Sequence, residues 1–199
     1  MKKLILASGS KRRHDILQNM GYEFDVIVPD VDEDSIKGLS PHELVTQLAV
    51  LKARAVLPQV CEDSIVLASD TIVELGGIIL GKPRDKNHAF SMLESLSGKS
   101  HHVYTGVCIL DAKSHKEISF YEKCIVHMAE ISHSEIHAYI ETGQPLDKAG
   151  SYGIQGPGAL FVSGIEGDFF AVCGLPVNRV YKNLGELGIF PQIKNAEYL

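Results

Sequence analysis

A long, mostly apolar segment followed by a tight turn restricts the fold more than any other feature of this sequence. Residues 65–75 carry the apolar run that is typical of a buried strand. Gly76 and Gly77 follow directly, and residues 78–80 read Ile-Ile-Leu, so the sequence predicts a two-residue hairpin into a second strand. Strand-like segments at about 102–110 and 117–130 predict a second hairpin. The sheet must therefore contain antiparallel neighbours.

Helix signals alternate with these strands. Ser40 and Glu43 form a capping box that opens a helix to about residue 57, and Ser132 and Glu135 form a second one. Periodicity and end signals predict further helices at about 11–20, 85–97 and 176–187, and further strands at 4–7 and 23–28. Because helices and strands alternate but two strand pairs are hairpins, we expect an α/β fold with a mixed sheet, not a strictly parallel one.

Length and composition agree with this fold class. The chain has 199 residues, 45% hydrophobic and 22% charged, which suits one domain or two small lobes that share a core. No apolar stretch approaches the ~20 residues that span a bilayer. The apolar run at 4–7 is too short for a signal peptide, so we expect a buried first strand in a cytoplasmic protein. Four cysteines without a Cys-x-x-Cys pair indicate free thiols in a reducing compartment.

The net charge and its placement restrict the partners. A formal net charge of −6 argues against a general nucleic-acid coat, and we expect neither a nucleic-acid nor a membrane partner. The first thirteen residues nevertheless hold no acid and five cations, which are Lys2, Lys3, Lys11, Arg12 and Arg13. A basic N-terminal turn on an acidic body is typical of a pocket for a small polyanion such as a free nucleotide.

The segment Ser8-Gly9-Ser10-Lys11-Arg12-Arg13 follows a predicted strand and opens a predicted helix. Small residues let a ligand approach the backbone, and free N–H groups at a helix N-terminus bind anions. Cations in a first helical turn are unfavourable unless an anion arrives, because the helix dipole is positive at that end. We therefore interpret this segment as a phosphate site, with a solvated basic turn as the alternative.

Two charged residues stand where apolar ones are expected. On a helical wheel of residues 44–56, Lys52 falls near the middle of the apolar arc, so its ammonium either reaches past the helix edge to solvent or points into a polar cleft. Asp70 belongs to a polar trio with Ser69 and Thr71 inside the apolar strand. A carboxylate there needs a counter-charge, a metal or several hydrogen bonds. We favour a functional aspartate over one that caps a neighbouring loop, because strand ends are common catalytic positions in α/β folds.

Lys82 and an acidic loop are further candidates. Through the Gly76-Gly77 turn, residue 71 lies opposite residue 82, so Lys82 returns to the end of the hairpin that carries Asp70. The two charges form either an anion site beside a base or a plain salt bridge. Residues 30–34 read Asp-Val-Asp-Glu-Asp and either bind Mg²⁺ or Mn²⁺ together with a substrate phosphate or form a solvated acidic loop.

Several short motifs occur in one order from Leu4 to about Gly188. They are LASGSKRR at 6–13, ASDTIV at 68–73, GKPRD at 81–85, LSGK at 96–99, VYTGV at 103–107, PLDKAGSYGIQG at 145–156 and GLP at 174–176. In these motifs the chain resembles the Maf family of nucleotide pyrophosphatases, in its dTTP/UTP branch. Gly9 and Lys11 depart from the family's usual alanine and proline, and residues 169–172, which we interpret as a strand, lack the serine-asparagine pair of many members.

The resemblance implies a fold and an activity. Residues 1–199 would form a single Maf-like pyrophosphatase domain, with an elongated mixed sheet, flanking helices and two lobes around a cleft, as in the Maf and inosine triphosphate pyrophosphatase group. The enzyme would hydrolyse dTTP and UTP, with modified pyrimidine nucleotides as further candidates, to the monophosphate and pyrophosphate, using Mg²⁺ or Mn²⁺. The family also suggests a homodimer. Two alternatives stay open: a nucleotide-binding regulator of septum formation and cell division without turnover, and a purine-directed house-cleaning pyrophosphatase.

The resemblance also assigns residues. The family's catalytic base maps onto Asp70, and its specificity positions map onto Arg13, Thr71 and Gln155. The phosphate- and metal-side positions map onto Ser10, Arg12, Glu33, Lys52 and Lys82, with Ser8 beside them in the same substrate-binding segment, and we expect the metal between the triphosphate, Glu33 and Asp70. Gln155 lies in the glycine-rich segment 143–176, and its amide both donates and accepts, which suits the imide edge shared by uracil and thymine.

Overall fold

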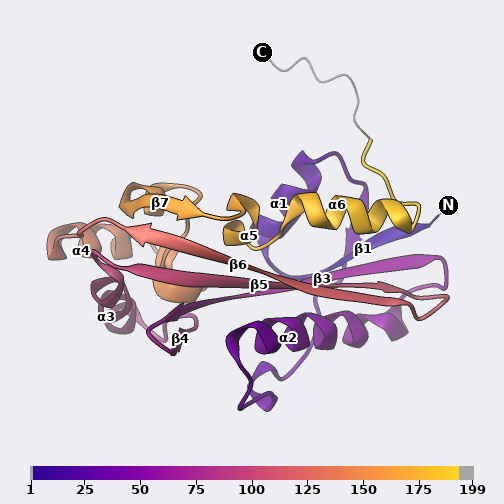
Figure 1. The fold of residues 1–199 in the computed structure, drawn as a ribbon, viewed down its shortest axis with the longest axis horizontal. Helices are drawn as coiled ribbons and strands as arrows, with labels where there is room; N and C mark the ends of the chain where they lie inside the picture. The colour runs from indigo at the N-terminus through magenta and orange to yellow at the C-terminus, as the bar shows by residue number, and fades with distance from the viewer. Residues whose placement is uncertain (1, 193–199) are drawn as a thin grey trace. The chain divides into compact units, whose positions relative to one another are not determined.

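The computed structural model describes residues 2–192, and within them seven strands form one mixed sheet (Figure 1). The strand order is β2-β1-β3-β5-β6-β7, and β4 pairs with β3 outside this path. β1 runs parallel to β2 and β3, whereas β4 is antiparallel to β3 and β7 is antiparallel to β6. The strands are β1 Lys3–Ala7, β2 Phe24–Val26, β3 Ser64–Leu75, β4 Ile78–Leu80, β5 Ser100–Asp111, β6 Glu117–Met128 and β7 Val162–Glu166. The prediction of an α/β fold with a mixed sheet is confirmed.

Six α-helices accompany the sheet within the described residues. They are α1 Lys11–Asn19, α2 Pro41–Val56, α3 Lys86–Leu96, α4 His133–Glu141, α5 Phe169–Cys173 and α6 Val177–Glu186. Both predicted capping boxes are present, with Ser40 and Glu43 opening α2 and Ser132 and Glu135 opening α4. The predicted bounds of the long elements differ from these by a few residues at most, because end signals mark a terminus only approximately.

Two elements differ from the prediction. Residues 169–172 belong to helix α5, and the interpretation of them as a strand is wrong. The reason is local: the carboxylate of Asp168 accepts the backbone N–H of Phe170 at 2.8 Å, and the Asp168 carbonyl accepts the N–H of Val172 at 3.1 Å, as at a capped helix start. Strand β7 was not predicted, and its pairing with β6 is irregular at His127 and Met128.

The chain divides into two compact units, and strands β3, β5 and β6 contribute residues to both. Unit 1 comprises residues 1–70, 106–121 and 174–199. In Figure 1 its helix α2 lies on one face of the strands, while α1 and α6 lie on the other. Small residues of α2, such as Ala49 and Ala53, pack against Val66 and Ala68 of β3, so the helix lies close to the sheet.

Unit 2 comprises residues 71–105 and 122–173. Its core joins α3 and α4 to the strands through side chains that include Leu93, Val103, Val126 and Ile136. The hairpin register pairs Val73 with Leu80 and Leu75 with Ile78, which confirms the turn at residues 76–77. Both turn glycines have positive φ, at 58° and 87°, a conformation that glycine adopts without strain.

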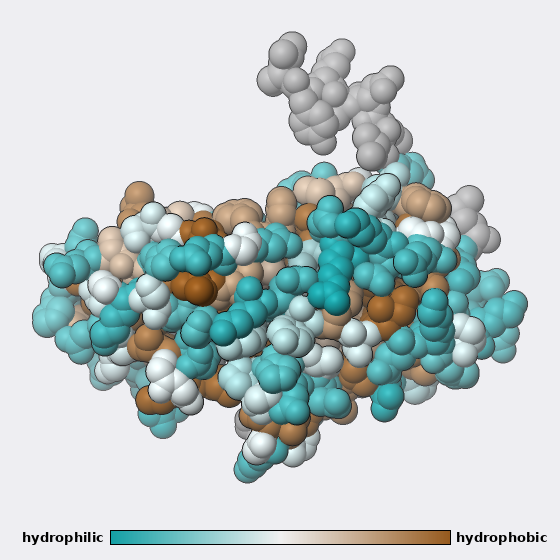
Figure 2. All heavy atoms as spheres, in the orientation of Figure 1, coloured by the Kyte–Doolittle hydropathy of each residue, from teal (hydrophilic) through white to brown (hydrophobic). Residues whose placement is uncertain are grey.

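The described part of the chain contains no helix that combines the length and the apolar character needed to cross a membrane. On the face drawn in Figure 2, hydrophilic side chains separate small apolar patches. The most exposed large apolar side chains are Leu160, Ile78, Val28 and Phe190, which come from four different segments. Single exposed apolar side chains of this kind are ordinary on protein surfaces.

Candidate functional site

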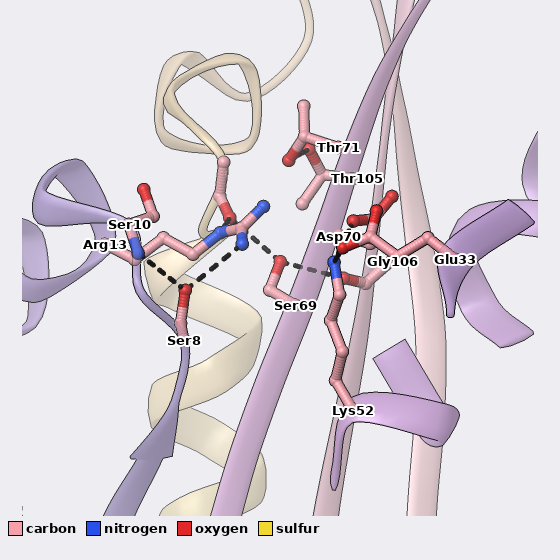
Figure 3. A network of polar contacts seen from close by, with 11 residues as sticks. Ser8, Ser10, Arg13, Glu33, Lys52, Ser69, Asp70, Thr71, Thr105 and Gly106 are labelled. Atoms are coloured by element: carbon pink, nitrogen blue, oxygen red, sulfur yellow. Dashed lines mark hydrogen bonds and ion pairs between the residues drawn. The ribbon is translucent and has the colours of Figure 1, made fainter. Parts of the chain in front are cut away.

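The polar trio of β3 divides its side chains between the two faces of the sheet, because successive residues of a strand point in opposite directions. Asp70 is 7% exposed and points toward α2, where Lys52 contacts it. Ser69 is fully buried and points to the other face, where it contacts the carbonyl of Gly174. Two neighbouring residues thus place polar groups on both sides of one strand (Figure 3).

Lys52 joins two carboxylates. Its Nζ lies 2.5 Å from Oδ1 of Asp70 and 2.9 Å from Oε1 of Glu33 (Figure 3). The side chains of Lys52 and Asp70 are each 10% exposed, whereas that of Glu33 is 53% exposed. The ammonium therefore lies between two carboxylates and does not reach past the helix edge to solvent, and Asp70 has the counter-charge that a buried carboxylate needs.

Helix α2 lies close to the sheet, and this close approach lets Lys52 reach Asp70. A Cβ atom on Gly106 of β5 would lie 2.2 Å from the carbonyl oxygen of Val45 in α2, so only glycine fits there. Val45 and Lys52 are seven residues apart, which is about two helical turns, and therefore share one face of α2. Gly106 thus sets the distance at which Lys52 meets β3.

Glu33 comes from the acidic loop, in the short 3₁₀ turn Glu33–Ser35. The backbone N–H of Ser35 donates to the carbonyl of Asp32 at 3.3 Å, and its hydroxyl donates to the same oxygen at 2.6 Å. This turn brings one carboxylate of the loop onto Lys52. The loop is therefore partly recruited to the cluster, which is more than a solvated acidic segment would show.

The basic turn at the start of α1 forms a second part of the site. Ser10 is the N-cap residue, its side chain caps no backbone N–H, and the first turn of the helix holds no acid. The Ser8 hydroxyl accepts the backbone N–H of Ser10 at 3.2 Å and Nη1 of Arg13 at 3.3 Å. Arg12 is half-buried in the same turn. Donors and cations therefore gather at this helix end, which suits an anion.

Arg13 is anchored at several points. Its Nε donates to the Gly174 carbonyl at 2.9 Å. Its Nη1 also contacts the Ser8 hydroxyl (Figure 3). Burial lowers the pKa of the Arg13 guanidinium from its ordinary value, while the charges of Asp70 and Glu33 act to raise that pKa. An arginine remains protonated in proteins, so the site keeps a half-buried positive charge here.

The remaining candidates lie in unit 2. Thr71 is half-buried, and its Oγ1 lies 2.9 Å from Oγ1 of Thr105, which donates to the carbonyl of Ala171 at 2.7 Å. Because Thr105 gives its single proton to Ala171, Thr71 must be the donor between the two hydroxyls. Lys82 and Gln155 are exposed, and neither makes a hydrogen bond or ion pair within residues 2–192. The ladder between β3 and β4 ends at the pair of Val73 and Leu80, so it does not include the predicted pairing of residue 71 with residue 82.

Four residues of the site received no role in the sequence analysis. They are Ser69, Thr105, Gly106 and Gly174, which fix the side chains discussed above. Each of them lies in one of the quoted sequence motifs, and this was the only sequence feature that could have pointed to them. Nothing in their spacing revealed a contact, because Ser69 and Gly174 are 105 positions apart.

Comparisons with known proteins identify the family of this chain. The sequence model of a family described as Maf-like protein matches residues 3–187. A protein of Clostridium novyi called dTTP/UTP pyrophosphatase is 46% identical over 189 residues, which cover 94% of this chain and 98% of that protein. A protein of Bacillus cytotoxicus with the same name is 49% identical over 184 residues, which cover 92% of this chain and 95% of that protein.

A solved structure shows a related fold. The structure of a HAM1 protein from Coxiella burnetii superposes with a TM-score of 0.55 at 15% sequence identity. The superposition covers 94% of this chain and 100% of that chain. The likeness concerns the fold and extends over nearly the whole sheet and its helices.

Proposed function

Because this chain belongs to the Maf family, we propose that it is a nucleoside triphosphate pyrophosphatase that hydrolyses dTTP and UTP to the nucleoside monophosphate and pyrophosphate. Relatives that are 46–49% identical over more than nine-tenths of the chain carry the name dTTP/UTP pyrophosphatase. Within the molecule, the buried contact between Lys52 and Asp70 is the observation that carries the proposal. A carboxylate held in this way suits proton transfer at a defined position.

Asp70 is the general base of this proposal. Lys52 holds Oδ1, while Oδ2 of Asp70 has no hydrogen-bond partner among the described residues. Oδ2 can therefore take a proton from a water whose oxygen attacks the α-phosphorus, as the bond from that phosphorus to the leaving pyrophosphate breaks. The Lys52 ammonium keeps the carboxylate oriented and offsets negative charge close to the reacting phosphate.

The basic turn of α1 would bind the phosphates. Ser8, Ser10 and Arg12 supply hydroxyl, backbone and guanidinium donors at a helix N-terminus that has no acid in its first turn. Arginine suits this task because its planar guanidinium binds phosphate oxygens in pairs. Lys82 would add a charge on the phosphate side, as an exposed lysine of unit 2.

Recognition of the base is assigned to Arg13, Thr71 and Gln155. The Arg13 guanidinium is held by Ser8 and Gly174, and the Thr71 hydroxyl is held by Thr105, so both present a fixed polar group. The Gln155 amide can donate and accept together, which suits the imide edge of uracil and thymine but not the different pattern of cytosine. This division supports uracil and thymine nucleotides over cytosine nucleotides as substrates.

A divalent metal fits the carboxylates of the cluster. Glu33 and Asp70 already share one cation, the Lys52 ammonium, and Mg²⁺ is commonly bound by one or two carboxylates together with substrate phosphates. Within residues 2–192 no group of three or more His, Cys, Asp or Glu side chains is arranged to hold a metal by itself. Glu33 and Asp70 would therefore hold Mg²⁺ or Mn²⁺ together with the nucleotide. The ion would offset negative charge on the phosphates.

Residues 1–199 would act as one pyrophosphatase domain in the cytoplasm, where free nucleoside triphosphates are the substrate pool, and would form a homodimer. The family match over residues 3–187 supports a single functional unit. Sedimentation of the full chain measures the oligomeric state, and a monomer at working concentration would contradict the dimer.

A panel of nucleoside triphosphates tests the proposed function. The full chain is incubated with dTTP, UTP, CTP, ATP, GTP, ITP and XTP at equal concentration with Mg²⁺ or Mn²⁺, and released pyrophosphate is measured. We expect the highest kcat/KM for dTTP and UTP. A preference for ITP and XTP would instead identify a purine-directed enzyme, and tight binding without pyrophosphate release would identify a nucleotide-binding regulator.

A further inference from the structure

The carbonyl of Gly174 accepts two hydrogen bonds from side chains that lie far apart in the sequence. Nε of Arg13 donates to it at 2.9 Å, and the hydroxyl of Ser69 lies 2.9 Å from it. A carbonyl oxygen has two lone pairs, so these contacts use its full capacity. This carbonyl is therefore one of the anchors that hold the Arg13 guanidinium, together with the Ser8 hydroxyl.

The backbone conformation of Gly174 requires glycine. Its φ is +106°, a conformation that other residues rarely adopt, so glycine is needed at this position. Gly174 follows helix α5 directly, and the residue therefore ends a helix and turns its carbonyl toward β3. Ser69 on β3 contacts this carbonyl and so holds it in place.

Ser69 links this carbonyl to the sheet. It is fully buried, and its hydroxyl also lies 2.8 Å from the carbonyl of Gly106 on β5. The single hydroxyl proton is placed between the two carbonyl oxygens, and the residue ties the Gly174 segment to β3 and β5. Because it has no exposed surface, Ser69 has no route to contact a substrate directly.

We propose that Ser69 is a positioning residue, which fixes the Arg13 guanidinium through the carbonyl of Gly174. The inference rests on the proposed function for its kinetic consequence, since Arg13 is there assigned to substrate recognition. Of the polar trio Ser69, Asp70 and Thr71, Ser69 is the residue to which the proposed mechanism gives no role. Loss of the Ser69 hydroxyl would remove the support of the Gly174 carbonyl and so weaken one of the anchors of Arg13.

The test compares Ser69→Ala with Ser64→Ala. Ser64 lies on the same strand, is 1% exposed and has its hydroxyl 3.2 Å from Sγ of Cys61, so both variants lose one buried hydroxyl. We expect a similar fall in unfolding free energy for both. Only Ser69→Ala should raise KM for dTTP, by about tenfold, with a smaller change in kcat, because binding contacts made equally in ground and transition states affect KM.

A double variant separates positioning from a general structural effect. In an Arg13→Gln background the guanidinium is absent, so adding Ser69→Ala should change KM by less than about twofold. If Ser69→Ala raises KM as much in that background as in the wild type, its effect does not pass through Arg13 and the proposal is overturned. Should Ser69→Ala fail to fold, Ser69→Cys, which is slightly larger and weakens the hydrogen bond, is measured in its place.

A direct readout does not depend on turnover. The Nε–H signal of Arg13 in a ¹H–¹⁵N spectrum, assigned by its loss in Arg13→Gln, should exchange slowly with solvent in the wild type and at least tenfold faster in Ser69→Ala. An unchanged exchange rate would contradict the positioning role. Absence of dTTP and UTP hydrolysis by the wild type would instead contradict the proposed function, and the exchange experiment would still decide the role of Ser69.

Discussion

The ammonium of Lys52 lies 2.5 Å from Oδ1 of Asp70, and both side chains are about nine-tenths buried. Glu33 approaches the same ammonium at 2.9 Å from a more exposed position. A buried ion pair adds little net stability against apolar residues, but removing one partner leaves the other charge without compensation. The pair is therefore better explained by the chemistry proposed for Asp70 than by a need for stability.

Replacing Lys52 should destabilise the fold. Lys52→Met leaves the Asp70 carboxylate buried without its counter-charge, and we expect the unfolding free energy to fall by about 3 kcal/mol. Denaturant unfolding measures it. The control is Lys86→Met, which breaks the exposed pair with Glu141 and should cost less than about 1 kcal/mol.

A double variant tests the reason for that cost. In Lys52→Met with Asp70→Asn the buried charge is gone, so the double variant should be more stable than Lys52→Met alone. Equal losses for Lys52→Met and Lys86→Met would show that the buried pair does not have the electrostatic role described here.

Gly106→Ala should displace the lysine without touching it. The new Cβ would meet the Val45 carbonyl at 2.2 Å, so α2 must move away from the sheet. We expect a loss of about 1–3 kcal/mol in unfolding free energy. We also expect a loss of about 10²-fold in kcat/KM for dTTP, because a displacement of about 1 Å misaligns the reacting groups.

The control for this variant is Gly185→Ala in α6. Its Cβ would meet only the side chain of Phe190, at 3.2 Å, and alanine suits a helix interior better than glycine. Its kcat/KM should stay at the wild-type value. A Gly106→Ala protein with full activity would show that α2 does not set the position of Lys52.

Acid should destabilise unit 2 through a buried histidine. His101 is 2% exposed, its Nε2 lies 2.8 Å from the Tyr152 hydroxyl, and its Nδ1 has no partner among the described residues. Burial lowers the pKa of His101 to about 4 from the ordinary 6.5, with smaller contributions from the neighbouring histidines 102 and 127, while Glu74 acts to raise it.

Because the folded-state pKa lies below the unfolded one, the unfolded chain binds more protons in this range. The stabilisation from neutral His101 is complete above about pH 6.5 and is lost as the pH falls toward 4, by about 3 kcal/mol in total. In His101→Gln, which stays uncharged, unfolding free energy should fall less steeply between about pH 7 and about pH 4. Parallel curves for the two proteins would contradict a buried neutral histidine.

Local sequence signals predicted most of the elements and the placement of Lys52 on the face of its helix that meets the sheet. The glycine pair at 76–77, the two capping boxes and the place of Lys52 in the apolar arc of α2 each depend on residues close together in the chain. The hydrogen bonds of Ser69 to Gly106 and Gly174 join positions 37 and 105 residues apart, and no local pattern encodes them.

The wrong interpretation of residues 169–172 has a similar cause. Two phenylalanines and a valine favour a strand by propensity, but Asp168 caps the segment at the start of a short helix. The contact of Arg13 with Gly174 could not be predicted from the sequence either, because the two residues are 161 positions apart and meet only in the folded chain.

The most direct test of the account compares pyrophosphate release from dTTP by the wild type and by Asp70→Asn, under the same metal and nucleotide concentrations. The substitution keeps the size of the side chain, and Lys52 keeps its contact with Glu33, so the variant should stay folded. The account predicts release by the wild type and a kcat lower by about 10²–10⁴-fold in the variant. A folded variant with the wild-type rate would contradict it.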